Sequence, residues 1–171
     1  MTRSMLRENS AYYPDGVVDT CIIVVSLFSN PLYKLAVEFI SKILTQEVNV
    51  AIPLTSIIGA THIVTRYLRI PFEEVERRVI KLLETESPAF YPHVSIANVM
   101  QALDYALRYR IKPWDGYIVS LAKTIGENTV YTFDKEFEKV EGLEIKNPFP
   151  EEAVRRYHEY VNKLLQSRKT Y

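Results

Sequence analysis

Residues 17–28 have the sequence VVDTCIIVVSLF, an apolar, β-branched run that follows the turn signal Pro14-Asp15-Gly16. We expect a buried first strand at the start of this run and a helix after it, with a boundary that the sequence does not resolve. Asp19 lies inside the run, where an ionised carboxylate without a partner would cost several kcal/mol. The fold must therefore place a compensating group beside Asp19.

Strand and helix patterns alternate along the rest of the chain. Helical periodicity or composition predicts helices over residues 32–44, 55–69, 72–84, 96–110 and 117–125, the last being apolar nearly all round. Short apolar runs predict strands within residues 48–52, 89–96, 130–132 and 143–145. Such alternation indicates an α/β fold with a parallel sheet covered on both faces. In the helix over 96–110 the pattern predicts a buried apolar stripe of Ile96, Val99, Met100, Leu103 and Leu107.

The chain of 171 residues is long enough for one domain with terminal additions. We expect an N-terminal arm over residues 1–16, one α/β domain over 17–149, and a C-terminal helix within 150–171. The apolar stripe of that helix, which includes Tyr157, would pack on the domain or lie at a dimer interface.

Composition excludes several classes of protein. Lysine plus arginine number 21 and aspartate plus glutamate number 21, so the zero net charge argues against a broad basic coat for nucleic acid. An apolar content of 47% excludes a disordered chain. One cysteine permits no internal disulfide and favours a reducing cytoplasm. The start of the chain has no signal-peptide core, and the run over 17–28 is too short to span a membrane.

Three aspartates stand where ligands of parallel sheets bind, beyond the carboxyl ends of strands. Asp19 lies inside the apolar run that begins with the first strand, and Asp134 directly follows the strand over 130–132. Asp115 stands at the start of the internal helix, just before residues 117–125. Each alone also fits a helix cap or an Asx-turn. Together they would repel one another at neutral pH unless protons or a cation intervened. Oxygen ligands favour Mg²⁺ or Mn²⁺, and such a site is suited to phosphodiester hydrolysis.

The sequence resembles the PIN-domain nucleases, which include the VapC-type ribonuclease toxins of toxin–antitoxin pairs. The resemblance is carried by VVDT at 17–20, WDGYIV at 114–119, VYTFDKEF at 130–137 and NPF at 147–149. It implies a three-layer α/β/α sandwich with a short, mainly parallel central sheet, and metal-dependent cleavage of RNA. Asp19, Asp115 and Asp134 would be the catalytic metal ligands. The resemblance also implies frequent dimerisation and a small antitoxin protein as a partner.

One position departs from the family pattern, which places a glutamate early in the helix after the second strand. Counting from Pro53 puts Gly59 at that position, and glycine supplies no ligand. His62 lies on the same polar stripe of the helix and could reach toward the missing acid, but a solvated edge explains such a stripe better. An active ribonuclease and an impaired PIN-like module that binds RNA or a protein therefore both stay open.

Other side chains near these motifs are candidate accessory or RNA-contacting groups. The basic ones could steer an RNA backbone, and the indole could stack on a base or lie in the core. Cys21 is expected to be a small buried residue rather than a nucleophile. The accessory candidates are Thr20, His62, Arg66, Arg108, Lys112 and Trp114.

Overall fold

The computed structural model describes residues 13–167, and short parallel strands lie at its centre. One sheet has the order β1 (Val17–Val18), β4 (Thr129–Tyr131) and β5 (Glu144–Lys146). β2 (Ile52–Pro53) and β3 (Phe90–Tyr91) form a second parallel pair. A parallel bridge between Val17 and Ala51 connects the two sets of strands. The predicted short parallel sheet is confirmed.

Each segment predicted to be helical contains a helix. They are α2 (Thr20–Ser26), α3 (Tyr33–Leu44), α4 (Leu54–His62), α5 (Phe72–Leu83), α6 (Ile96–Tyr109), α7 (Pro113–Ile125) and α8 (Glu151–Ser167). The helix expected over 55–69 is divided, because α4 continues as a π-helical turn (Ile63–Tyr67). A 3₁₀ turn (Lys135–Lys139) follows β4.

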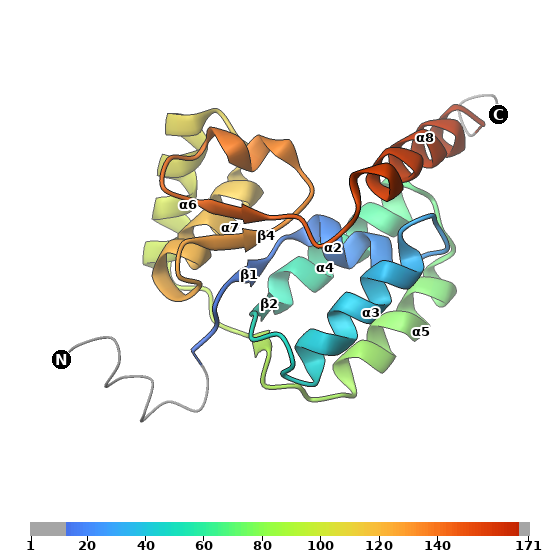
Figure 1. Ribbon diagram of the computed structural model, residues 1–171, viewed down its shortest axis with the longest axis horizontal. Helices are drawn as coiled ribbons and strands as arrows, with labels where there is room; N and C mark the ends of the chain where they lie inside the picture. Colours follow the sequence, from blue (N-terminus) through green and yellow to red (C-terminus); the bar gives the residue numbers. More distant parts are fainter. Residues whose placement is uncertain (1–12, 168–171) are drawn as a thin grey trace.

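The strands separate two apolar cores. Neighbouring residues of a strand point to opposite faces, so Val18 packs with α2, α3 and α4, whereas Val17 packs with α7. Figure 1 shows α6 and α7 on one side of the strands and α3, α4 and α5 on the other. The structure is therefore a three-layer α/β/α sandwich. None of the helices in residues 13–167 is both long enough and apolar enough to cross a membrane.

The predicted buried stripe of α6 is wrong. The face of α6 that packs on α7 carries Asn98 and Ala102, and a Cβ at Gly116 of α7 would clash with the carbonyl oxygen of Ala102. Asn98 also donates a 3.1 Å hydrogen bond to Ser120 Oγ of α7. Small and hydrogen-bonding side chains thus allow the close approach of the two helices. The apolar stripe lies on the outer side, between 46 and 82% exposed: Ile96, Val99, Met100, Leu103 and Leu107.

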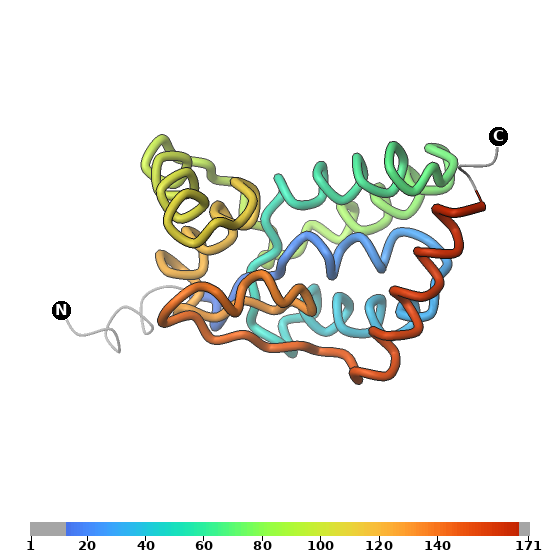
Figure 2. The backbone as a smooth tube through the Cα atoms, turned by 90° about the horizontal axis from the view of Figure 1, so that it is seen from above, coloured from blue at the N-terminus to red at the C-terminus, as the bar shows by residue number. Residues whose placement is uncertain are grey.

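The two ends of the described chain are tied to the domain. Near the start, Asn49 Nδ2 donates a 2.6 Å hydrogen bond to the carbonyl oxygen of Tyr13. At the other end Tyr157 of α8 packs against Phe28 and Phe133, and Figure 2 shows α8 at the end of the molecule opposite α6. Most of the predicted N-terminal arm, residues 1–12, and residues 168–171 of the predicted C-terminal helix lie outside the described part of the chain.

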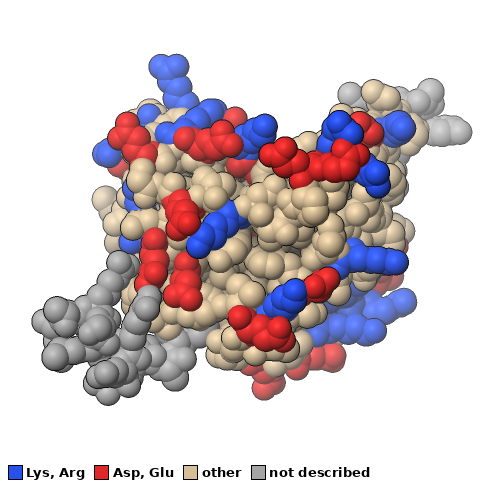
Figure 3. All heavy atoms as spheres, viewed as in Figure 1, with Lys and Arg blue, Asp and Glu red and all other residues tan. Residues whose placement is uncertain are grey.

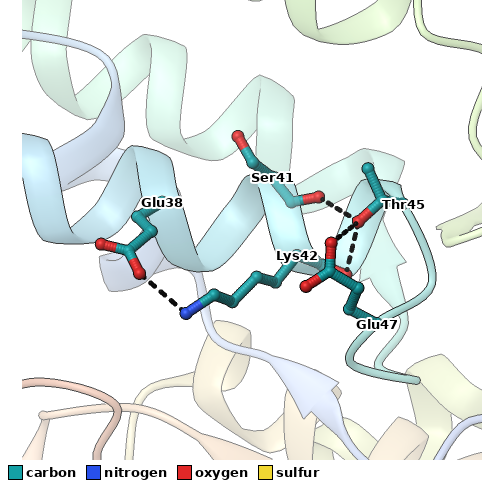
Figure 4. A network of polar contacts seen from close by, with 5 residues as sticks. All are labelled: Glu38, Ser41, Lys42, Thr45 and Glu47. Atoms are coloured by element: carbon teal, nitrogen blue, oxygen red, sulfur yellow. Dashed lines mark hydrogen bonds and ion pairs between the residues drawn. The ribbon is translucent and has the colours of Figure 1, made fainter.

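Charged side chains of both signs are interspersed on the face shown in Figure 3. One group of polar residues lies at the end of α3, where Lys42 Nζ is 2.7 Å from Glu38 Oε1 (Figure 4). Nearby, the Thr45 hydroxyl donates a hydrogen bond of 3.0 Å to the Ser41 carbonyl oxygen and lies 3.0 Å from Glu47 Oε1. Such exposed contacts add little to stability, so the fold rests on the two apolar cores.

Candidate active site

Asp19 is held at the junction of β1 and α2. Its backbone occupies the cap position of α2, but its side chain makes no capping hydrogen bond. The side chain is instead 3% exposed, and its Oδ2 accepts a 2.9 Å hydrogen bond from the hydroxyl of Thr132. The compensating group that the sequence required is thus a hydroxyl just beyond β4.

Asp134 is connected to Asp19 through the same hydroxyl. The backbone N–H of Asp134 donates a 2.9 Å hydrogen bond to Thr132 Oγ1, while Asp134 Oδ1 accepts one of 2.9 Å from the backbone of Glu136. The capping role that the sequence left open therefore uses one carboxylate oxygen. Sequence reasoning missed Thr132, although its place between a buried strand and Asp134 was an available signal.

Asp115 lies in the first turn of α7 and is 7% exposed. Among the described residues its Oδ2 is buried and has no hydrogen-bond partner. Burial, followed by the charge of Asp19 and then that of Asp134, raises the pKa of Asp115 to about 6, whereas Lys112 opposes the shift. An orphaned, buried carboxylate oxygen of this kind calls for a cation, a proton or a water.

Asp19 and Asp115 are both affected by neighbouring carboxylates. Burial raises the pKa of Asp19, hydrogen bonds from Cys21 and Thr132 oppose that shift, and the charge of Asp134 adds to it. All three pairs of the aspartates therefore interact electrostatically. As the side chains stand, no group of three or more His, Cys, Asp or Glu residues within 13–167 forms a cage that could hold a metal ion.

The position of the missing glutamate is covered by an indole ring. A Cβ on Gly59 would lie 2.9 Å from Cζ2 of Trp114, closer than side chains approach without moving. Trp114 Nε1–H donates a 2.7 Å hydrogen bond to Oγ1 of Thr20, the residue after Asp19. Trp114, rather than His62, thus lies against position 59.

The remaining accessory candidates are not gathered at one place. Lys112 is the cap residue of α7, and its charge acts on both Asp115 and Glu136. Arg108 pairs with Asp104 at 3.1 Å on the exposed side of α6. His62 packs edge-on against Tyr67, and with Arg66 it lines a separate groove of about 580 Å³ between α4 and α5.

A larger cleft of about 990 Å³ opens beside Asp134. Arg155 and His158 of α8 line this cleft, and so does Cys21. The Cys21 side chain is half-buried, with its Sγ 3.3 Å from Thr132 Oγ1. Burial and the neighbouring Asp19 carboxylate raise the pKa of this thiol well above its ordinary value. Cys21 is therefore unsuited to act as a thiolate nucleophile.

Two solved structures share this fold. A toxin–antitoxin complex from Klebsiella pneumoniae has a TM-score of 0.53 and 17% sequence identity, covering 78% of this chain and 98% of that chain. PAE2754 from Pyrobaculum aerophilum has a TM-score of 0.52 and 17% identity, covering 88% of this chain and 89% of that chain. At this level of identity both likenesses establish the fold alone.

The sequence of the chain also matches the model of a protein family. No curated protein matches the chain. The model of the PIN domain family, however, matches residues 16–143, a segment that includes Asp19, Asp115 and Asp134. Because this match spans well over half of the 171 residues, the chain belongs to the PIN domain family.

Proposed function

We propose that this chain is a divalent-metal-dependent endoribonuclease that hydrolyses RNA phosphodiester bonds with an activated water. The observation that carries the proposal is the connection of Asp19 and Asp134 through Thr132, together with a buried Asp115 on which the charges of both act. Membership of the PIN domain family, whose members are generally nucleases, supports the same chemistry.

The donor set fits Mg²⁺ or Mn²⁺. Oδ2 of Asp115 is buried without a hydrogen-bond partner among the described residues, and all three groups are hard oxygen donors. Mg²⁺ commonly binds through one or two carboxylates, retains several waters and completes its shell with substrate phosphate. Asp19, Asp115 and Asp134 would therefore hold the ion directly or through water, without a complete protein cage.

When bound, the cation would activate a water and neutralise charge that develops on the phosphate. The chain itself positions the reacting groups: Thr132 orients Asp19, and the first turn of α7 presents Asp115. Lys112 adds a positive charge beside Asp115 that favours a phosphate. In hydrolysis the water gives up a proton as its oxygen bonds to phosphorus, the bond from phosphorus to O3′ breaks, and O3′ takes a proton.

Cleavage of single-stranded RNA by the purified chain tests this proposal. We expect cleavage with Mn²⁺ or Mg²⁺, none with EDTA, and a loss of at least about 100-fold in Asp19→Asn and Asp115→Asn, since each loses a charged group at the reacting centre. Asp104→Asn is the matched control, because Asp104 is an exposed aspartate paired with Arg108 on α6. Equal rates in all variants, or cleavage that survives EDTA, would refute the proposal.

The departure at Gly59 favours a second candidate function, an impaired PIN-like module that binds RNA or a protein. Position 59 supplies no carboxylate, and Trp114 lies against it. Binding of RNA with no cleavage under any divalent cation would establish this alternative in place of the enzyme.

The proposal includes a toxin role in the cytoplasm, with a small antitoxin-like protein covering the exposed stripe of α6. The solved toxin–antitoxin complex supports a partner of this kind, and the single cysteine fits a reducing compartment. Light scattering on the purified chain tests the occupant of the stripe: a monomer fits the proposal, whereas a dimer that Leu103→Lys dissociates would assign the stripe to a second copy.

A further inference from the structure

The indole of Trp114, the residue before Asp115, is held by contacts with neighbouring residues. Its Nε1–H is bonded to Thr20 Oγ1 at 2.7 Å, and its ring lies 6.3 Å from the ring of Tyr117 between centroids. On another side, Gly59 leaves room for the ring, since a Cβ there would be 2.9, 3.3 and 3.5 Å from three of its atoms. Three contacts from three helices therefore set the orientation of the indole.

This placement connects the ring to two of the aspartates. Thr20 directly follows Asp19, and Trp114 directly precedes Asp115. The ring therefore cannot shift far without disturbing the segments that carry both carboxylates. Even so, Trp114 remains 39% exposed, so part of the side chain next in sequence to Asp115 is accessible.

The open part of the ring has a defined chemistry. Nε1–H is the one hydrogen-bond donor of an indole, and here it is used by Thr20. The rest of the ring is aromatic carbon, and an aromatic ring can stack with any nucleobase regardless of its identity. Lys112, two residues earlier, places a positive charge close to Asp115, where it would attract the neighbouring phosphate.

We propose that Trp114 is a stacking platform for one base of the RNA next to the cleaved phosphate, built in the space against Gly59. This inference rests on the proposed ribonuclease function, and it makes Trp114 a positioning residue. The chain thereby exchanges an acidic group at position 59 for an aromatic contact. Selection of substrate would follow single-strandedness rather than base identity, because a base within a duplex is not free to stack on protein.

Fluorescence of the full chain tests this directly, because Trp114 is its one tryptophan. The probe is a single-stranded oligouridylate of eight nucleotides, titrated in Ca²⁺ and again in EDTA, with an RNA duplex of the same length for comparison. We expect saturable quenching by the single strand in Ca²⁺ and little quenching by the duplex. Unchanged fluorescence at RNA concentrations that saturate binding would overturn the inference.

Anisotropy of the labelled oligouridylate measures the contribution of the ring. We expect Trp114→Ala to weaken binding by about 5- to 100-fold and Trp114→Phe by less, which matches the loss of one stacked base. Tyr160→Ala is the matched control, since Tyr160 on α8 is 37% exposed. The Trp114→Phe variant and the quenching of the natural chain keep the test valid if Trp114→Ala fails to fold.

The outcomes separate this inference from the proposed function. Quenching and weakened binding without cleavage would retain the platform and refute the enzyme. Cleavage with equal RNA affinity and equal KM in the Trp114 variants would retain the enzyme and refute the platform. If quenching of the Trp114 fluorescence depends on the protein concentration and not on RNA, another protein molecule covers the ring. That result would also refute the stacking platform.

Discussion

The hydroxyl of Thr132 donates a 2.9 Å hydrogen bond to Oδ2 of Asp19, across 113 positions of sequence. The same oxygen accepts a 2.9 Å hydrogen bond from the backbone N–H of Asp134. One buried hydroxyl therefore orients the carboxylate that follows β1 and the backbone of the aspartate that follows β4. The candidate active site depends on this hydrogen-bonded connection between the two strand ends.

Replacing Thr132 with valine removes the hydroxyl but keeps the branched shape. We expect the free energy of unfolding to fall by about 1–3 kcal/mol, because Asp19 Oδ2 and the Asp134 N–H lose their partner in a buried place. Thr132→Ser, which keeps the hydroxyl, should retain most of the stability. Urea unfolding of the three proteins measures this, and equal stability of the valine and serine variants would contradict the role of the hydroxyl.

The raised pKa of Asp115 predicts a pH-dependent stability of the metal-free protein. Its ordinary pKa is 3.8 and its folded value is about 6, so between these values the native state binds more protons than the unfolded state. Stability contributed by Asp115 therefore falls as pH rises from about 4 to 6 and then levels off. At pH 7.5 we expect Asp115→Asn to stabilise the metal-free chain by roughly 1–3 kcal/mol.

The same comparison at pH 4 serves as the internal control. There the natural Asp115 is largely protonated, so Asp115→Asn should change the free energy of unfolding by little. Asp104→Asn, at an exposed ion pair, should change it by less than about 1 kcal/mol at either pH. Destabilisation by Asp115→Asn at pH 7.5 would show that the carboxylate has a stabilising partner.

The stripe of α6 gives a prediction about packing. Leu107 is 82% exposed, so Leu107→Gln should alter the free energy of unfolding by no more than about 0.5 kcal/mol. Ala102→Leu on the opposite face should cost about 1–3 kcal/mol or more, because it enlarges the close contact with Gly116. Thermal unfolding of both variants tests the assignment of the two faces, and the reverse order of effects would overturn it.

A glutamate introduced at position 59 would restore the acidic residue that the family pattern places there. Gly59→Glu alone should lower stability, since its Cβ would lie 2.9 Å from the Trp114 ring. Combined with Trp114→Ala, the glutamate gains space, and we expect tighter Mn²⁺ binding than in Trp114→Ala alone. Calorimetric titration with Mn²⁺ makes the comparison. No gain in affinity from the added carboxylate would mean that the missing acid belongs elsewhere.

Much of the fold follows from local patterns. The apolar run around Asp19 predicts a buried strand end, and the all-round apolar segment after Asp115 predicts the internal helix α7. These signals succeed because a centrally buried element admits few polar residues on any face. The position of Asp134 after its strand follows from the same logic of parallel sheets.

Two features could not be predicted, each for a physical reason. The orientation of α6 is set by a close approach at Gly116 and by hydrogen bonds of Asn98, and these interactions outweigh the apolar stripe without leaving a periodic signal. The position of the Trp114 ring depends on the absence of a side chain at Gly59, 55 positions away, and on a hydroxyl at Thr20. Contacts between segments so far apart in the sequence cannot be predicted from local sequence patterns.

The proposed ribonuclease function requires Asp19, Asp115 and Asp134 to act as one cation site. Titration of the full chain with Mn²⁺ at pH 7.5, followed by calorimetry, tests this most directly. We expect saturable binding in the natural chain, at least about ten-fold weaker binding in Asp19→Asn and Asp115→Asn, and unchanged binding in Asp104→Asn, since removing a carboxylate removes a ligand. Equal affinity in all four proteins, or no saturable binding in the natural chain, would contradict it.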